Sequence, residues 1–268
     1  MTNNFTTKAI FGFCSFSGYV GAAFISMLHV FFNIFKMIFK VIKSIVTVKF
    51  YVSQFPRYLL EISFFSIVVV FLTSIFTGAV LTMQAYKGLS FLMNSDTLAS
   101  VVVSAIIREL GPVLTGLMIA GRISSSISAE ISTMNNTDQV EALKTLSINP
   151  FRYLVVPRIL AGVISMPLLL LLSDTVALMG SYFVATIQFS ISQDLYLTSL
   201  VKYFNYTDCM VGVLKSVIFG AIITLVGCFK GLSAARGSEG VGRATTESVV
   251  LSSILILVFN YIISFLSI

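Results

Sequence analysis

The chain has 268 residues, of which 57% are hydrophobic and only 10% are charged. About 25% of the residues of a soluble domain are charged, so this composition excludes an ordinary soluble domain and indicates an integral membrane protein. The formal net charge of +6 does not indicate nucleic-acid binding, because the basic residues are spread along loops beside apolar segments.

The apolar runs are about 20 residues long, which is the length of a membrane-spanning helix, whereas barrel strands would be about 10 residues of alternating character. We therefore expect an all-α integral membrane protein. Cys14, Cys209 and Cys228 lie in apolar sequence without metal-ligand or redox spacing, and the single histidine, His29, has no second candidate ligand. The sequence predicts neither a metal site nor a cofactor.

Residues 1–55 form an N-terminal region with an interfacial, amphipathic pattern. Basic residues there recur at helical spacing opposite isoleucines, which is typical of a helix that lies in the membrane interface. The basic stripe is Lys36, Lys40 and Lys43, and the apolar stripe is Ile38, Ile42 and Ile45. Residues 9–30 are long enough either to span the membrane or to lie in its interface. The N-terminus lacks a basic n-region with a cleavage site, so we expect no removable signal peptide.

Residues 56–268 are predicted to form one transmembrane domain with five spans. The third span exceeds the roughly 20 residues that a bilayer requires, so we expect it to tilt, emerge or kink, with Pro167 as the candidate kink. The five predicted spans are Ile62–Tyr86, Ala99–Ala120, Ile159–Phe189, Asp208–Phe229 and Glu247–Leu266.

The distribution of Lys and Arg predicts the orientation of these spans. A cytoplasmic N-terminal region leaves only Lys87 and Lys202 outside, so the positive-inside rule places the C-terminus outside. The inside set is Lys8, Lys36, Lys40, Lys43, Lys49, Arg57, Arg122, Lys144, Arg152, Arg158, Lys230, Arg236 and Arg243.

A long polar segment, Gly121–Arg158, separates the second and third spans and is predicted to be a structured cytoplasmic loop. Asn136 with Gln139 resembles a capping box, and Asn149-Pro150 is a helix stop, so a helix of roughly three turns fits between them. Its apolar residues recur at every third position. Such a stripe suits either a groove on another protein or packing on the chain's own domain. The stripe consists of Val140, Leu143 and Leu146.

Four ionisable residues fall at predicted bilayer depth: Arg108, Glu109, Asp174 and Lys215. Each would cost about 2.5–3.5 kcal/mol facing lipid, so we expect them to face the bundle interior or water. Neighbouring helix residues point about 100° apart, so Arg108 and Glu109 need partners, for which Asp174 and Lys215 are available. Gly111-Pro112 then interrupts the hydrogen-bond ladder. The group forms either a polar substrate cavity or a buried ion pair that fixes helix register.

Small residues follow at the end of the second span, where they favour close helix packing and also suit a self-association face. They are Gly116, Ala120, Gly121, Ser124, Ser125, Ser126 and Ser128.

These motifs, in their order and spacing from about residue 55 onward, together resemble the MlaE family, the permease subunits of Mla/Mce-type ABC lipid transporters. The segments that carry the resemblance are Arg108–Val113 (RELGPV), Ala120–Arg122, Ala129–Ile131 with Met134, Thr137–Gln139, Asn149-Pro150, Pro157-Arg158, Ala161–Ser165, Pro167–Leu169, Lys215-Ser216 and Gly242–Thr246 (GRATT).

The resemblance implies an N-terminal interfacial helix, five transmembrane helices and a short cytoplasmic coupling helix between spans two and three. It also implies a homodimer, a cytoplasmic ABC ATPase, a periplasmic MCE-domain protein and phospholipid as cargo. Arg108, Glu109, Asp174 and Lys215 become the candidate substrate-binding residues. The candidate ATPase-coupling residues are Glu130, Asp138, Gln139, Glu141 and Leu143.

Glu141-Ala-Leu143 is similar to the EAA loop of ABC importers, but the glycine that normally follows is absent, which argues against a simple importer. The chain has no P-loop motif, and Gly237–Gly242 is predicted to be a loop that lacks the P-loop lysine, so ATP hydrolysis is expected on a partner subunit.

We therefore expect a non-enzymatic permease in a bacterial inner membrane, with a plastid inner envelope as the alternative location. The alternative functions are a permease for another amphiphile such as a sterol, a stand-alone channel, and an intramembrane lipid-processing enzyme using Glu109, Asp174 or His29. The sequence leaves the transport direction and the lipid head group open.

Overall fold

The computed structural model describes residues 32, 36–37, 54–89 and 95–267. The chain divides into two compact units, Met1–Thr47 and Val48–Ile268, and all five predicted spans fall in the second. Most of the predicted interfacial region, including residues 9–30, lies outside the described residues. Within it, Phe32 and Lys36 are helical, and the Lys36 ammonium lies 4.5 Å from the centroid of the Phe32 ring.

Every element between residues 54 and 267 that the structure describes is helical, and five segments there are long and apolar enough to cross a membrane. The all-α fold and the five predicted spans are confirmed. The first span comprises α2 (Phe55–Ser63), η2 (Phe64–Ser66) and α3 (Ile67–Leu89); the second comprises α4 (Ser95–Ala105), η3 (Ile106–Leu110), α5 (Gly111–Ile119), η4 (Ala120–Ser124) and α6 (Ser125–Asn136). After α7 (Gln139–Thr145), the third comprises η5 (Phe151–Val155), α8 (Val156–Phe183) and η6 (Val184–Gln188); α9 (Gln193–Lys202) precedes the fourth, α10 (Tyr206–Leu232), and the fifth, α11 (Ser238–Leu266).

The second span continues as helix to Asn136, so the prediction of a loop from Gly121 was wrong for its first part. The polar sequence that suggested a loop consists largely of serines on a packed helix face. Ser124, Ser128 and Ser132 are fully buried, and the backbone carbonyl of Ser124 accepts a hydrogen bond from Ser248 Oγ of α11. Small side chains of this kind allow helices to approach closely, as expected for this segment.

The ends of the third and fifth spans also differ from prediction. Asn149 Oδ1 accepts a hydrogen bond from the backbone N–H of Phe151, so Asn149-Pro150 begins the third span as well as following α7. The fifth span starts at Ser238 rather than Glu247, which makes most of the predicted loop Gly237–Gly242 helical. Gly237 precedes this helix with a φ of 97°, a conformation that glycine adopts readily.

The third span is the most buried of the five, whereas the first and fifth are the most exposed. Helix α8 packs against α2, α3, α5 and α10. Gly162 of α8 and Gly220 of α10 face each other so closely that a side chain at either position would collide with the other helix. Pro167 lies inside α8, which continues on both sides of it.

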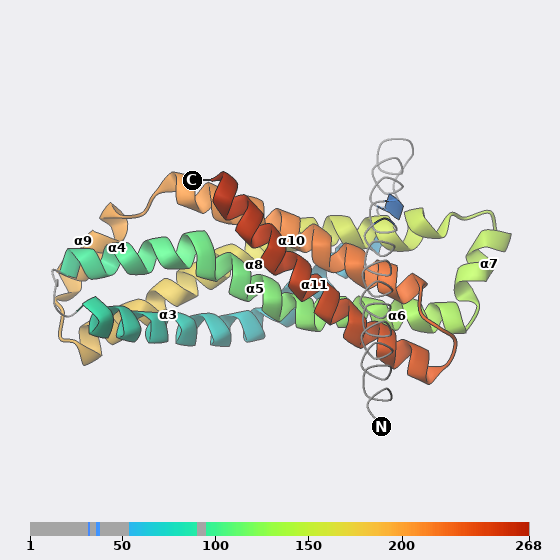
Figure 1. The fold of residues 1–268 in the computed structure, drawn as a ribbon, viewed down its shortest axis with the longest axis horizontal. Coiled ribbons are helices and arrows are strands. Elements are labelled where there is room, and N and C mark those ends of the chain that lie inside the picture. The colour runs from blue at the N-terminus through green and yellow to red at the C-terminus, as the bar shows by residue number, and fades with distance from the viewer. Residues whose placement is uncertain (1–31, 33–35, 38–53, 90–94, 268) are drawn as a thin grey trace, which may run out of the picture. The chain divides into compact units, whose positions relative to one another are not determined.

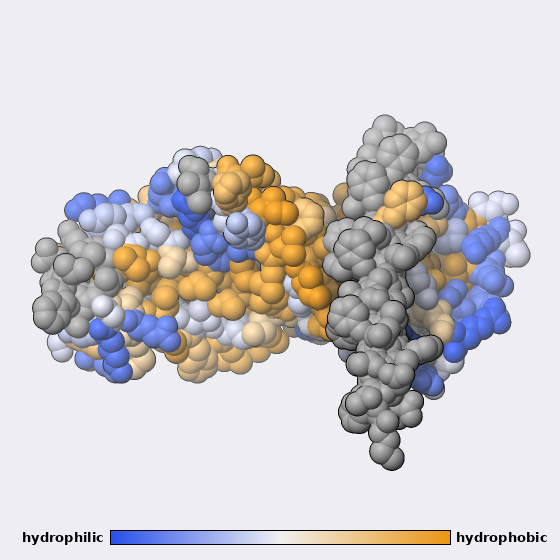
Figure 2. All heavy atoms as spheres, viewed as in Figure 1, coloured by the Kyte–Doolittle hydropathy of each residue, from blue (hydrophilic) through white to orange (hydrophobic). Residues whose placement is uncertain are grey.

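Figure 1 places α7 at one end of this unit and α9 at the other, and we call these the α7 end and the α9 end. Hydrophobic residues cover the middle of the visible face, with hydrophilic residues toward both ends (Figure 2). Helix α9 was not predicted. It packs on α4 through the fully buried Tyr196, and burial raises the pKa of this phenol, which donates a hydrogen bond to Ser181.

Candidate functional site

The interruption predicted in the second span is present as a five-residue π-helical turn, η3, that carries Arg108 and Glu109. Pro112 follows in the first turn of α5 and has no N–H to donate to the carbonyl of Arg108, four residues earlier. That carbonyl instead accepts a hydrogen bond of 2.8 Å from the Lys215 ammonium of α10. The fourth span thus satisfies a backbone group that the proline leaves free.

Lys215 also forms an ion pair with Glu109, with 2.9 Å between Nζ and Oε2. The Lys215 side chain is fully buried, while 39% of the Glu109 side chain is exposed. Two residues of α11 complete the cluster: Ser264 Oγ donates to Glu109 at 2.9 Å and accepts from Lys215, and Asn260 Nδ2 donates to Glu109 at 3.3 Å. The cluster therefore joins spans two, four and five.

Arg108 points to a different set of partners. Its Nη1 lies 3.5 Å from Asp208 Oδ1, and its Nη2 donates to the backbone carbonyl of Ser267 at 3.2 Å. The contact with Glu109 is looser, at 3.9 Å, as expected for neighbours in a helix. Asp208 rather than Asp174 is the carboxylate that pairs with Arg108. These contacts place the cluster beside the first turn of α10 and the end of α11, toward the α9 end.

Asp174 lies apart from this cluster. Its carboxyl group packs directly against Gly111, where a side chain would collide with Oδ1, and the residue is only 8% exposed. Asp174 makes no ion pair with any residue that the structure describes. Of the four predicted substrate-binding residues, the structure therefore brings together Arg108, Glu109 and Lys215. Sequence reasoning missed Asp208, Asn260 and Ser264, whose only signal was a polar side chain near the end of an apolar span.

The second candidate site is the connection around α7. The predicted capping box is wrong: Asn136 ends α6, and Asp138, with a left-handed φ of 56°, precedes α7 without a side-chain cap. Asn136 instead holds the α10–α11 turn, since its Oδ1 accepts from Gly237 N and its Nδ2 donates to Gly237 O. The helix has seven residues, about two turns rather than three.

The apolar stripe of α7 is divided between two environments. Val140 is buried against the chain's own domain, Leu143 is half-buried, and Leu146 is 70% exposed at the end of the helix. Glu141 is exposed. The structure thus shows packing on the chain's own domain for one side of α7 and leaves the other side exposed.

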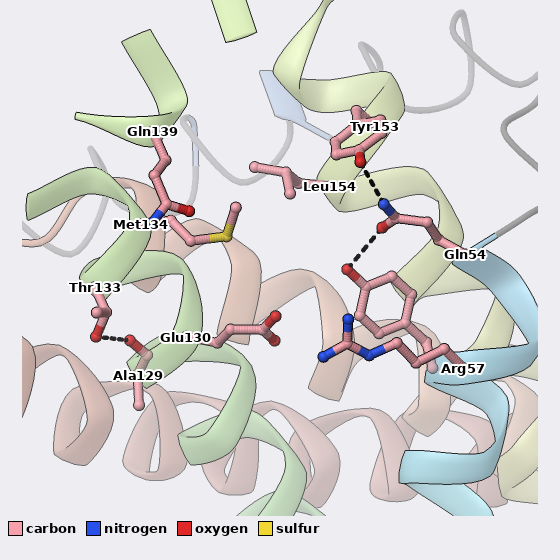
Figure 3. A pocket seen from close by; sticks show the side chains of 10 residues that line it. Gln54, Arg57, Ala129, Glu130, Thr133, Met134, Gln139, Tyr153 and Leu154 are labelled. Carbon is pink, nitrogen blue, oxygen red and sulfur yellow. Dashed lines mark hydrogen bonds between the residues drawn. The ribbon is translucent and has the colours of Figure 1, made fainter. Parts of the chain in front are cut away.

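A cavity of about 560 Å³ lies beside α7, between α2, α6 and η5 (Figure 3). Across it, Tyr58 donates to Gln54 Oε1, and Gln54 Nε2 donates to the hydroxyl of Tyr153. Gln139 of α7 and Glu130 of α6 also line the cavity, so two of the five predicted coupling residues share it. Asp138 instead pairs with Arg236 at the surface, 3.3 Å away.

Glu130 forms an ion pair with a buried arginine. Its Oε2 lies 2.8 Å from Nη2 of Arg158, a fully buried residue that the sequence had placed in a loop. The Arg158 guanidinium also lies 4.4 Å from the Tyr58 ring and donates to the carbonyl of Leu154. The buried Arg158 guanidinium thus joins α2, α6 and α8 near α7.

Comparison with known proteins assigns this architecture to one family. Residues 55–266 match the family model described as Permease MlaE. A probable ABC transporter permease protein of Rickettsia typhi is 46% identical over 226 residues, covering 84% of this chain and 87% of the relative. Probable ABC transporter permease proteins of Synechocystis and Pyropia yezoensis are 36% and 33% identical; the alignments cover 75% and 86% of this chain, and 76% and 88% of those proteins.

Proposed function

The chain belongs to the MlaE family of ABC transporter permeases, and from this premise we propose that it moves phospholipid, driven by ATP hydrolysis on a partner ATPase. Such a substrate needs charged groups for its head and an apolar surface for its chains. The proposal rests on one observation: charged side chains and an apolar groove lie side by side at η3.

The charged part is the Arg108–Glu109 turn. The two side chains are 31% and 39% exposed, so each can reach a ligand without leaving its partners. An arginine suits a phosphate group and a carboxylate suits a head-group amine. Lys215 is fully buried and acts through Glu109, which it holds in place.

The apolar part of the proposed site begins at the residue after Glu109. Leu110, the last residue of η3, lines a groove of about 330 Å³ with Phe76, Val80 and Leu81 of α3. Their exposed surfaces offer an acyl chain a path along the first span. A homodimer would enclose this path if the exposed first or fifth span faced a second copy, and we include that dimer in the proposal.

Coupling to the ATPase is proposed at α7, through the exposed Glu141 and Leu146 and the neighbouring residues Glu130, Asp138, Gln139 and Leu143. Among the residues that the structure describes, most of the basic ones lie toward the α7 end, which favours a cytoplasmic location for it. A periplasmic MCE-domain protein would then meet the α9 end. We propose the bacterial inner membrane as the location.

The test is gentle purification from native membranes, followed by mass spectrometry of the associated proteins and lipids. We expect an ATPase, an MCE-domain protein and bound phospholipid. A sterol or another amphiphile in place of phospholipid would overturn the cargo assignment. A chain that purifies alone, with detergent loss controlled by crosslinking before extraction, would contradict the ATPase-driven mechanism.

A further inference from the structure

Asp174 has a position that phospholipid binding does not explain. It lies in α8, with its carboxyl group against Gly111, at the junction of η3 and α5 where the second span departs from regular α-helix. Any side chain at position 111 would occupy the space of Asp174 Oδ1. The carboxyl group therefore fills the site that the glycine leaves open, and it does so only while spans two and three are closed against each other.

The polar groups around Asp174 leave it without a partner. Its Oδ1 is buried and accepts no hydrogen bond from any described residue, and Thr115 Oγ1 of α5 is likewise buried without one. From α3, Ser74 faces this region but is hydrogen-bonded to Ser173. The titratable group that interacts with Asp174 from α10 is the thiol of Cys209.

The charged residues near Asp174 form ion pairs with other residues. On η3, Arg108 pairs with Asp208 and Glu109 pairs with Lys215. Helix α5 carries no ionisable residue, and the basic residue of α3, Lys87, lies in its last turn. Within the part of the chain that the structure describes, no cation reaches the Asp174 carboxyl.

An ionised carboxylate in this position would be buried without a counter-charge, which costs far more than burying the neutral acid. The closed arrangement therefore favours the protonated form of Asp174. When the acid ionises, its proton passes to water and leaves a carboxylate that needs solvation, so water or a cation must enter between Gly111 and α8.

We propose that Asp174 is a proton-binding site that links the closure of span two on span three to protonation. The closed conformation, with the carboxyl group against Gly111, is the protonated one, and ionisation favours separation of the two spans at Gly111. The conformational equilibrium of the permease, and hence its transport rate, then depends on pH through this residue.

The direct test is infrared spectroscopy of the purified permease at neutral pH, comparing the wild type with Asp174→Asn. We expect the wild type to show the carbonyl stretch of a protonated carboxylic acid and the variant to lose it. Asp194→Asn is the matched control: Asp194 is exposed on α9, so this variant should keep the band. Identical spectra for wild type and Asp174→Asn would overturn the proposal. So would failure of Asp174→Asn to fold, because a neutral isostere suits a neutral site.

A second measurement tests the consequence, and it rests on the proposed transport function. In proteoliposomes containing the complete transporter, wild-type transport should change with pH, whereas Asp174→Asn should lose that dependence and Asp194→Asn should retain it. An unchanged pH profile in Asp174→Asn would overturn the link to transport. Absence of phospholipid transport in the wild type would contradict the proposed function, while the infrared result would still decide whether Asp174 holds a proton.

Discussion

The ammonium of Lys215 lies 2.9 Å from the carboxylate of Glu109, and the same ammonium donates to the backbone carbonyl that precedes Glu109. One buried side chain of the fourth span therefore satisfies both a charge and a free backbone group of the second. This double role explains why an interrupted helix is tolerated here, since irregular backbone within a membrane needs partners from protein or a cavity.

Replacing Lys215 with Met should destabilise the protein by about 3 kcal/mol. The change leaves the Glu109 carboxylate without its cation and the Arg108 carbonyl without its donor, and breaking a buried pair costs about 3–5 kcal/mol. We place the effect at the lower limit because Glu109 is partly exposed to solvent. Denaturant unfolding in detergent micelles measures it.

Lys230→Met is the control, because Lys230 pairs with Glu247 at a more exposed position and should lose only about 0–1 kcal/mol. Equal losses in the two variants would contradict the special role of Lys215.

Replacing Glu109 with Gln should lower stability, because the buried Lys215 loses its counter-charge, but it should leave the protein folded and reduce bound phospholipid by about tenfold. Glutamine keeps the size of the side chain and can still bond Ser264, but it loses the charge that binds a head-group amine; one charge-assisted hydrogen bond is worth about 1.5–3 kcal/mol. Mass spectrometry of lipid per protein provides the measurement. Glu61→Gln, at a half-buried residue of α2, is the control. Unfolding of Glu109→Gln, with normal lipid content in what remains folded, would instead favour a purely structural ion pair.

The spans were predictable from the sequence because the bilayer imposes a length and a hydropathy on them, and this constraint is local. Their ends were not, since the helices continue beyond the apolar core: the buried serines of α6 look like loop sequence until the packing on α10 and α11 is known. Helix α9 was missed because ten amphipathic residues carry no membrane signal.

The pairing of charges required tertiary information. Lys215 with Glu109 followed from the need to satisfy buried charges, but Asp208 lies at the start of the fourth span and gave no sign that it meets Arg108. Asn136 shows the same limit, because its contact with Gly237, distant in sequence, outweighs its local preference for a helix cap.

Reversing the charge at position 141, Glu141→Lys, should weaken association with the ATPase by about tenfold, or about 1.4 kcal/mol, while membrane insertion stays intact. Glu141 is exposed on α7, so the change affects the partner's surface rather than the fold. Co-purification of the ATPase at increasing salt measures it. Glu239→Lys, an exposed reversal in the first turn of α11 at the same end, is the matched control. Full association and transport by Glu141→Lys would count against α7 as the coupling helix.

The buried arginine at the α7 end should prove more critical to stability than any surface charge nearby. Arg158→Met removes the ion pair with Glu130 and the contact with the Tyr58 ring, and it leaves a carboxylate at the wall of the cavity. We expect a loss of about 3 kcal/mol, the lower limit for a broken buried pair, because the Glu130 side chain is partly exposed. Arg243→Met, at an 81% exposed side chain, should leave stability almost unchanged.

The pair is tested by adding Glu130→Gln to Arg158→Met. Once the arginine is gone, a neutral glutamine removes the unpaired charge, so the double variant should be more stable than Arg158→Met alone. If the two losses simply add, the ion pair is not what holds α2, α6 and α8 together, and the stabilisation must come from the packing of Arg158 on Tyr58. If the double variant recovers stability but ATP hydrolysis no longer drives transport, the pair also transmits movement from α7 to the spans.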